Sequence, residues 1–431
     1  MPAPEAELLE TSFAALDRLT QGLTGPLGIA VSGGSDSTAL TVITAEWAQA
    51  RGCLVSTATV DHRLRPESRA EAVDAGLMAQ GLGLEHQILD WDHKDPNLPN
   101  HPNLMARARQ VRHRLLGNWA REQGLSAVLL GHTQDDQAET VLMRLLRGSG
   151  VDGLSGMTEK AALEEMLWLR PLLSIRRNAL QGFLTARGIR WSNDPSNDDP
   201  EYDRVQIRQT MRALELSPEG LAATAETLAR QRRVLERDRD RLADAAVTIG
   251  ALGEVYLDPD AFAAAETDTS MAVLADAICW IGGLAYRPRY HSLKALWQSL
   301  GIKTLGGVLS DRSLKSWMLC RELAHCPEPS TLAPITWDHR WALSGPKMQD
   351  ISVRALGEDG HSHLKRQSHM GPETWQTSPR RARLVVPSFW RRDTLLSVPA
   401  AGFHDEEWGA ESPFCAVLKP PPARFRRSER L

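Results

Sequence analysis

Short apolar runs alternate with helix-forming segments through the first half of the chain. The runs at 29–31, 54–60, 85–89 and 128–130 are bounded by polar or glycine-containing turns, and we expect them to form buried strands. The segments between them have the composition and start signals of helices. Strands that alternate with helices predict an α/β fold with a doubly wound parallel sheet.

The pattern changes after about residue 216. A long charged segment at 217–245 carries a partial apolar stripe, and helical patterns continue to about residue 300. A proline-rich stretch then leads into short strand-like runs, one of them at 383–387. We therefore expect an N-terminal α/β domain over 1–216, a helical middle domain over 217–326, and a small α+β C-terminal domain over 327–431 with a disordered tail.

The first predicted strand runs into the string Ser-Gly-Gly-Ser-Asp-Ser, and a helix follows it. Gly33 and Gly34 lack a Cβ, so successive backbone N–H groups can turn toward one anion while the helix start adds its partial positive charge. The string is not a Walker A loop, because the Gly-Lys-Ser/Thr ending is missing. A plain Gly-Ser turn is the alternative, but the full string favours a phosphate cradle with hydroxyls from Ser32, Ser35 and Ser37.

Asp36 places a negative charge inside this cradle. A carboxylate would repel a bound polyphosphate unless a cation lay between them, so Asp36 predicts a bridging Mg²⁺. The string resembles the PP-loop of ATP pyrophosphatases, enzymes that adenylate a substrate and release pyrophosphate. The resemblance implies that ATP binds at this loop.

A second group of candidate residues follows the strand at 128–130. His132 stands at the strand exit, and Thr133 and Asp136 have the spacing of a capping box. Asp136 and Glu139 share one helical face and predict a site for a cationic group or Mg²⁺. Helix capping alone remains an alternative for Asp136, and a buried strand-end position remains one for His132. The opposite face is expected to pack on the sheet through Val141, Leu142, Leu145 and Leu146.

Two further segments place polar residues near the same edge of the sheet. Asp61 directly follows the second predicted strand, where ligands of parallel sheets bind, although an ordinary surface loop is the alternative. Arg109 and Arg112 share a helical face within 104–117, a segment without acidic residues. That face is suited either to polyphosphate or RNA backbone, or to simple contact with water.

Composition narrows the class of protein. The formal net charge of −4 does not announce a nucleic-acid binder, and the five scattered cysteines favour reduced thiols over a disulfide framework or a zinc site. An export signal and a long apolar run are both missing, so we expect a cytoplasmic protein without a membrane span. Arginines near the C-terminus, interleaved with Phe389 and Trp390, either contact RNA by phosphate binding and stacking or form a basic surface over core aromatics.

These segments together resemble the tRNA(Ile)-lysidine synthetase family. The sequence departs from the family pattern at two positions. His113 stands where a tyrosine is expected, and Val205 stands where an asparagine usually follows the arginine equivalent to Arg204. The resemblance is carried by 32–37, by Asp61-His62 with Leu64-Arg65, by Arg109 with Arg112, by 132–150, by 170–173, by Trp191 with 193–197, and by Arg204 with Arg208.

The resemblance implies a two-step ligase. Members adenylate the wobble cytidine of a tRNA(Ile) with a CAU anticodon and then replace AMP with free L-lysine. It implies that Asp136 and Glu139 orient lysine and that His132 contacts ATP or lysine. The residues expected at ATP are Ser32, Gly33, Gly34, Ser35, Asp36, Ser37, Asp61, Arg109 and Arg112, with Mg²⁺ at Asp36.

Two rival functions remain. A PP-loop tRNA thiolase would keep the adenylation but insert sulfur, and it would need closely placed cysteines, whereas no two cysteines here are nearer than Cys320 and Cys326. A nonenzymatic RNA-binding protein with a degenerate loop is opposed by the intact Asp36 and the acidic group. The sequence leaves the oligomeric state open.

Overall fold

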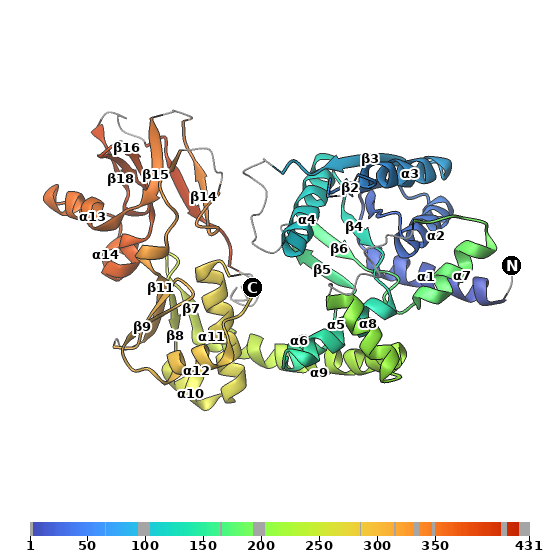
Figure 1. Ribbon diagram of the computed structural model, residues 1–431. Helices are drawn as coiled ribbons and strands as arrows, with labels where there is room; N and C mark the ends of the chain where they lie inside the picture. Colours follow the sequence, from blue (N-terminus) through green and yellow to red (C-terminus); the bar gives the residue numbers. More distant parts are fainter. Residues whose placement is uncertain are drawn as a thin grey trace. The chain divides into compact units, whose positions relative to one another are not determined.

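A computed structural model describes residues 3–64, 66–93, 104–163, 166–192, 203–284, 286–313, 316–331, 336–346, 350–406 and 412–421. The chain forms two compact units, Met1–Arg232 and Arg233–Leu431 (Figure 1). Arg65, the 193–197 segment and the arginine-rich tail, which carried sequence expectations, lie outside the described residues. The predicted boundaries at 216 and 326 stay predictions.

A six-stranded sheet organises the first unit. Its strand order is β3-β2-β1-β4-β6-β5, in which β5 is an antiparallel edge strand and every other pair is parallel. The predicted doubly wound α/β fold is confirmed. The strands are β1 (Leu27–Ala30), β2 (Val55–Asp61), β3 (Glu85–Asp90), β4 (Ala127–Leu130), β5 (Lys160–Leu163) and β6 (Met166–Leu169).

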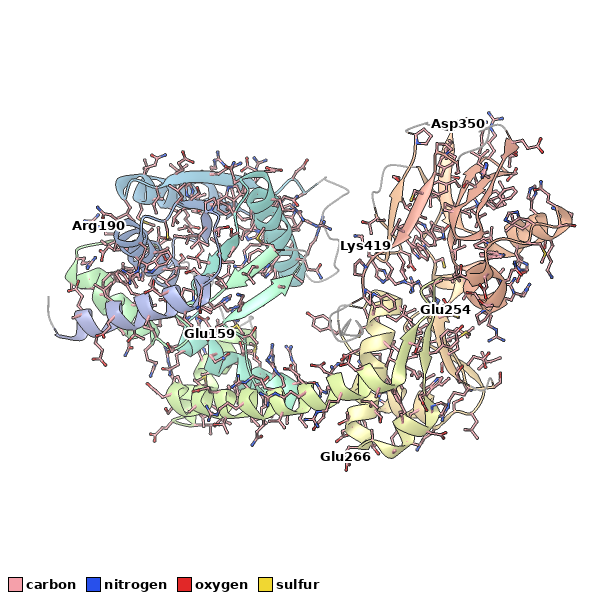
Figure 2. The ribbon with its side chains drawn as sticks, turned by 180° about the vertical axis from the view of Figure 1, so that it is seen from behind. Glu159, Arg190, Glu254, Glu266, Asp350 and Lys419 are labelled. Carbon is pink, nitrogen blue, oxygen red and sulfur yellow. The ribbon has the colours of Figure 1, made fainter. Side chains whose placement is uncertain are left out.

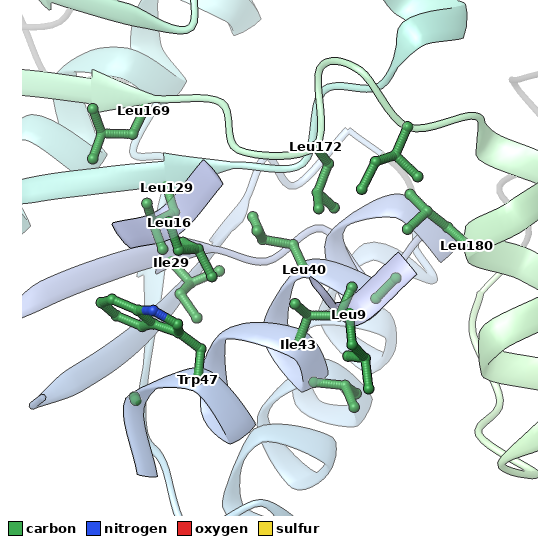
Figure 3. Close-up of a cluster of buried hydrophobic side chains, with 14 of the residues drawn as sticks. Leu9, Leu16, Ile29, Leu40, Ile43, Trp47, Leu129, Leu169, Leu172 and Leu180 are labelled. Atoms are coloured by element: carbon green, nitrogen blue, oxygen red, sulfur yellow. The ribbon is translucent and has the colours of Figure 1, made fainter. Parts of the chain in front are cut away.

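Helices cover both faces of this sheet because alternate strand residues point to opposite sides. Leu129 of β4 joins Ile29, Leu40 and Trp47 in one buried cluster (Figure 3), while its neighbours Val128 and Leu130 join another with Trp119. The helices are α1 (Ala3–Thr20), α2 (Ser35–Arg51), α3 (Ser68–Gly81), α4 (Leu104–Glu122), α5 (Gln134–Leu146), α6 (Val151–Leu154), α7 (Arg177–Ala186) and α8 (Asp203–Ala213).

Helix α5 departs from the expected packing. Leu145 and Leu146 were expected to pack on the sheet, but they are 52% and 68% exposed. Leu142 packs with Ile207 and Met211 of α8. The buried residues of α5 run from Asp136 to Leu142, so burial follows position along the helix, and the last turn reaches water.

The long helix α9 (Pro218–Ala246) belongs to both units, since the boundary between them falls after Arg232. Its first half is fastened to the first unit. Ala225 is fully buried, and Arg232 donates a hydrogen bond to Ser155 Oγ at 2.7 Å. Among the described residues, neither α9 nor any other helix is long and apolar enough to cross a membrane.

The second unit holds two hydrophobic clusters, one around α11 and β8 and one around β15 and β16. Glu254, labelled in Figure 2, is buried and accepts hydrogen bonds from Leu252 N at 3.0 Å and Ser378 Oγ at 3.3 Å. The helices are α10 (Pro259–Ala264), α11 (Thr267–Gly282), α12 (Tyr290–Gln298), α13 (Gly357–Arg366), α14 (Glu373–Thr377) and α15 (Arg380–Leu384).

Three antiparallel sheets complete this unit, ordered β7-β8-β11-β10-β9, β12-β15-β16-β17-β18 and β13-β14-β19. Their strands are β7 (Val247–Ile249), β8 (Val255–Leu257), β9 (Ile302–Leu305), β10 (Val308–Asp311), β11 (Trp317–Arg321), β12 (Ser330–Thr331), β13 (Thr336–Trp337), β14 (Trp341–Ser344), β15 (Ile351–Ala355), β16 (Pro387–Arg391), β17 (Thr394–Val398), β18 (Phe403–His404) and β19 (Cys415–Leu418).

One sequence expectation for this unit is wrong, and the structure decides between two alternatives for another. The run at 383–387 is not a strand, because α15 extends to Leu384 and β16 begins only at Pro387. Phe389 and Trp390 are buried core residues and present no ring to a base. Several of the neighbouring arginines are paired or packed: Arg380 with Glu358, Arg381 with Asp311, Arg391 with Asp350, and Arg383 over Trp375.

Candidate active site

The loop between β1 and α2 has the geometry of an anion cradle. Gly33 has φ of +81°, a conformation that a residue with a Cβ rarely adopts. Ser37 Oγ closes the loop by accepting from Ser32 N at 3.1 Å and donating to Gly34 O at 3.1 Å. Gly34 is the N-cap of α2 and supplies no side-chain acceptor, so the first N–H groups of the helix are available to an anion.

Gly131 brings the end of β4 against this loop. A Cβ built on Gly131 would lie 3.0 Å from the backbone of Asp36 and Ser37. Any larger residue would therefore push the loop away from β4. This close approach is what delivers His132 and the start of α5 to the cradle, and nothing in the sequence distinguishes Gly131 from an ordinary turn glycine.

Asp136 has two tasks in the structure. Its Oδ2 accepts from Thr133 N at 2.8 Å and Thr133 Oγ1 accepts from Asp136 N at 3.4 Å, which are the two bonds of a capping box. Thr133 Oγ1 also donates to Asp136 Oδ2 at 2.8 Å. Its Oδ1 faces the other way and accepts from Arg177 Nη2 at 3.0 Å. The two alternatives for Asp136 are thus compatible, because one oxygen caps the helix while the other faces the site.

Asp36, Asp136 and Glu139, which we call the acidic triplet, converge on Arg177. The guanidinium lies 2.7 Å from Asp36 Oδ2, 3.0 Å from Asp136 Oδ1 and 3.6 Å from Glu139 Oε1. Arg208 of α8 donates to Glu139 Oε1 at 2.6 Å. The site is therefore a buried set of three carboxylates shared by two guanidinium groups.

Burial and charge act in opposite directions on these carboxyls. Burial raises the pKa of Asp36 above its ordinary value, and Arg177 only partly offsets it. Burial alone would also raise the pKa of Asp136, but Arg177 and the hydrogen bond from Thr133 bring it below its ordinary value. Asp136 is consequently an anion at neutral pH.

Arg177 was missed in the sequence analysis, and Arg208 entered it only as part of the family pattern. Arg177 stands after an apolar segment at the start of α7, a position that gives no local sign of carboxylates far away in sequence. The backbone places it: Asp135 Oδ2 accepts from Arg177 N at 2.8 Å, and Gln134 N donates to Ile175 O at 2.9 Å. The start of α7 is thus fixed to the start of α5.

His132 lies at the exit of β4 as expected, and it is uncharged. Burial lowers its pKa to about 3, the nearby Asp136 offsets this in part, and the positive charges of Arg170, Arg112 and Arg204 lower it further. Its Nδ1 is buried without a hydrogen-bond partner in the described part of the chain. The ring can therefore bond to a ligand that enters beside it.

A group of arginines lies near His132. Burial, with Arg109 and Arg204 nearby, lowers the pKa of Arg112 to about 10, and burial and Arg109 likewise lower that of Arg170. Mutually repelling cations of this kind favour binding of a polyanion. His113 keeps an aromatic contact, since its ring packs edge-on against Trp168 at 4.8 Å.

Asp61 ends β2 and is buried, but its Oδ1 serves the local loop. It accepts from Arg63 N at 2.9 Å and from Ser68 Oγ at 2.7 Å. It lines an open surface hollow of about 610 Å³ together with Arg63, Leu64, Pro66, Ser68 and Arg69. A role in ATP binding stays a prediction for Asp61.

The residues fit a magnesium ion held partly by phosphate. Asp36 Oδ1 accepts one hydrogen bond, from Ser35 Oγ at 3.0 Å, and so keeps lone pairs for a metal. Within the described ranges, no three His, Cys, Asp or Glu side chains form a complete cage for a metal ion. Mg²⁺ commonly uses one or two carboxylates with substrate phosphates, which is the donor set available here.

Comparison with known proteins decides the family. A family model described as a PP-loop domain matches residues 11–214. A tRNA(Ile)-lysidine synthase from Ruegeria pomeroyi is 37% identical over 400 residues, which cover 89% of this chain and 90% of that protein. The chain belongs to the tRNA(Ile)-lysidine synthase family.

Other relatives of the same name extend over most of the chain. The tRNA(Ile)-lysidine synthase of Brucella anthropi is 32% identical over 403 residues, covering 86% of this chain and 84% of that protein. That of a Bradyrhizobium species is 39% identical over 296 residues, covering 65% and 78%. The resemblance found in the sequence is confirmed, and this lysidine synthase family member is a tRNA-modifying ligase with an ATP-using PP-loop domain.

Proposed function

We propose that this chain adenylates the wobble cytidine of a tRNA(Ile) with a CAU anticodon and then attaches free L-lysine to form lysidine. One observation carries the two-step reaction. The loop suited to polyphosphate also supplies Asp36, one of three carboxylates that converge on a single cationic group. A site for a polyanion and a site for a cation thus adjoin at one sheet edge.

In the first step the cytosine oxygen attacks the α-phosphorus of ATP and pyrophosphate leaves. The N–H groups at the start of α2 and the hydroxyls of Ser32 and Ser35 bind phosphate oxygens. Arg109 and Arg112 contact the polyphosphate from α4. Asp36 would hold Mg²⁺, which when bound neutralises charge that develops on the leaving pyrophosphate.

In the second step the lysine side-chain amine attacks the activated cytosine carbon and AMP leaves. Asp136 and Glu139 bind and orient the ammonium group, which must lose a proton to solvent water before its nitrogen attacks. Because its pKa is held at about 3, His132 is a weak base, and we assign it a hydrogen bond to ATP or lysine instead.

The rival thiolase is disfavoured by the placement of the cysteines. Cys53 is the one cysteine in the sequence of the first unit, and it is exposed. The other four belong to the second unit. A sulfur-transfer centre built from paired cysteines therefore has no counterpart in the unit that carries the cradle.

The test is pyrophosphate release from ATP with each substrate omitted in turn. We expect release to require both tRNA(Ile) carrying a CAU anticodon and lysine for turnover, and mass spectrometry of the digested tRNA to show lysidine. The methionine tRNA with the same anticodon is the control and remains unmodified. Multiple-turnover release that is indifferent to lysine, or a thiolated product, would contradict the proposal. We further propose that the enzyme acts in the cytoplasm, on the tRNA pool there.

A further inference from the structure

We infer that Arg177 is the resident cation of the ligand-free acidic triplet and that it withdraws when a cationic substrate enters. The inference rests on the proposed function in one respect, since it takes lysine as that substrate. Arg177 therefore competes with the ligand for the acidic triplet and does not help to bind it.

The guanidinium of Arg177 faces the acidic triplet with all of its nitrogens. Three different nitrogens of Arg177 face three different carboxylates: Nε faces Asp36, Nη2 faces Asp136 and Nη1 faces Glu139. The planar guanidinium is thereby used in full. A lysine ammonium that bound the same oxygens would have to take positions that these nitrogens occupy.

The negative charges of the acidic triplet need a counterion. The side chains of Asp36, Asp136 and Glu139 are only 16%, 7% and 3% exposed, and buried like charges repel strongly. Within the described residues, Asp36 and Asp136 form ion pairs with Arg177 alone, while Glu139 also pairs with Arg208. Without Arg177 or a substitute cation, two of these carboxylates would be buried without a counterion.

The backbone of Arg177 is fixed in place, whereas its side chain is partly exposed. Its backbone N–H is held by Asp135, and the neighbouring Arg176 grips Asp135 and Glu219. The helix that follows is anchored in the core by Leu180. The Arg177 side chain itself is 23% exposed, so the long side chain can swing toward water while the helix stays in place.

A free acceptor in the triplet supports a ligand role. Glu139 is buried, and its Oε2 has no hydrogen-bond partner in the described part of the chain. An unpaired carboxylate oxygen in such a position is costly unless a donor arrives. An ammonium that bonds to Glu139 Oε2 gains an acceptor that neither arginine uses, which favours its entry over Arg177.

The experiment titrates lysine into the full-length protein and into Arg177→Gln, with binding heat as the readout. A resident side chain that occupies the site about nine-tenths of the time weakens apparent affinity about tenfold, so we expect lysine to bind Arg177→Gln about tenfold more tightly. Arg187→Gln, at the C-cap of the same helix with partners Glu5 and Glu46, is the matched control and leaves lysine affinity unchanged.

Thermal unfolding without ligand gives an independent measurement. Arg177→Gln is expected to melt at a lower temperature than the unaltered protein. Addition of lysine, or of Mg²⁺ alone, should raise the melting temperature of Arg177→Gln by more than that of the unaltered protein. If Arg177→Gln does not fold, Arg177→Lys takes its place: it keeps the charge but cannot span three carboxylates, so it should bind lysine more tightly than the unaltered protein does.

The outcomes separate this inference from the proposed function. Weaker lysine binding by Arg177→Gln would overturn the inference, even if the unaltered enzyme forms lysidine. If lysine binds none of the proteins but Mg²⁺ restores Arg177→Gln preferentially, the resident-cation role stands and the lysine assignment fails. If neither cation distinguishes Arg177→Gln from Arg187→Gln, the inference is wrong.

Discussion

Single residues in this site serve the fold and the chemistry at once. Asp136 caps α5 with one oxygen and meets Arg177 with the other. Its substitution would therefore mix a loss of helix capping with a loss of ligand binding. Asp36 and Glu139 are better probes, because neither caps a helix with its side chain.

At Asp36, substitution by Asn keeps the shape of the side chain and removes its charge. Burial raises the pKa of this carboxyl, so folding gains little from its charge, and the melting temperature is expected to stay within a few degrees. Transfer of AMP to tRNA should be abolished because the metal-attracting charge is lost. Transfer within a few-fold of the unaltered enzyme would exclude the Mg²⁺ role.

At Glu139, substitution by Gln removes one negative charge that the proposal gives to lysine. A charge-assisted hydrogen bond contributes about 1.5 to 3 kcal/mol, so the KM for lysine should rise roughly tenfold or more. Adenylated tRNA should still form and accumulate when lysine is limiting, as radiolabelled AMP on tRNA would reveal. Loss of adenylation with an unchanged lysine KM would instead assign Glu139 to ATP or metal.

At the scale of elements, hydrophobic patterning predicted β1, β2, β3 and β4 of the first unit to within about two residues at their ends, whereas β5 and β6 were not predicted. For β4, an apolar run followed by Gly-His-Thr marked the strand and the next helix start, because local composition sets both. Arg177 could not be found this way. Its partners Asp36 and Asp136 come from other elements, and only the sheet order and the cap by Asp135 bring them together.

The contact between β4 and the cradle gives an element-scale prediction. Gly131→Ala would place a methyl group 3.0 Å from the loop backbone, and overpacking of this kind costs about 1 to 3 kcal/mol. The KM for ATP should rise as the loop shifts. Gly117→Ala in α4 meets nothing within 4 Å and is the control, expected to be neutral or stabilising. Equal stability of the two variants in urea would refute the close contact.

At the scale of the whole molecule, half-buried uncharged histidines predict loss of stability in mild acid. Burial lowers the pKa of His62 to about 4 and that of His132 to about 3. Below pH 6.5 the unfolded chain takes up protons that the folded chain refuses, so unfolding becomes easier as pH falls toward 4. Each histidine costs up to about 2 kcal/mol at pH 5, while the raised pKa of Asp36 acts with the opposite sign.

Urea unfolding at pH 7 and pH 5 measures this effect. His132→Asn should reduce the number of protons taken up on unfolding at pH 5 by about one, and the free energy of unfolding should then depend less on pH. His291→Asn is the control, since His291 is exposed on α12 and folding moves it little from water. If His132→Asn and the unaltered protein lose the same stability between the two pH values, His132 is not buried in its neutral form.

Helix α9 has a consequence for how the protein is made. The first unit uses the buried Ala225, the bond from Arg232 to Ser155, and the pair between Arg176 and Glu219. A nascent chain stalled with only residues 1–216 outside the ribosome therefore lacks part of the surface on which its own α5 and α7 rest. Synthesis must pass Arg232 before the ATP-using unit can finish folding. Until then, the apolar side chains of Leu142 and Ile207 lack part of their cover, and they stay so for longer in a chain that emerges slowly.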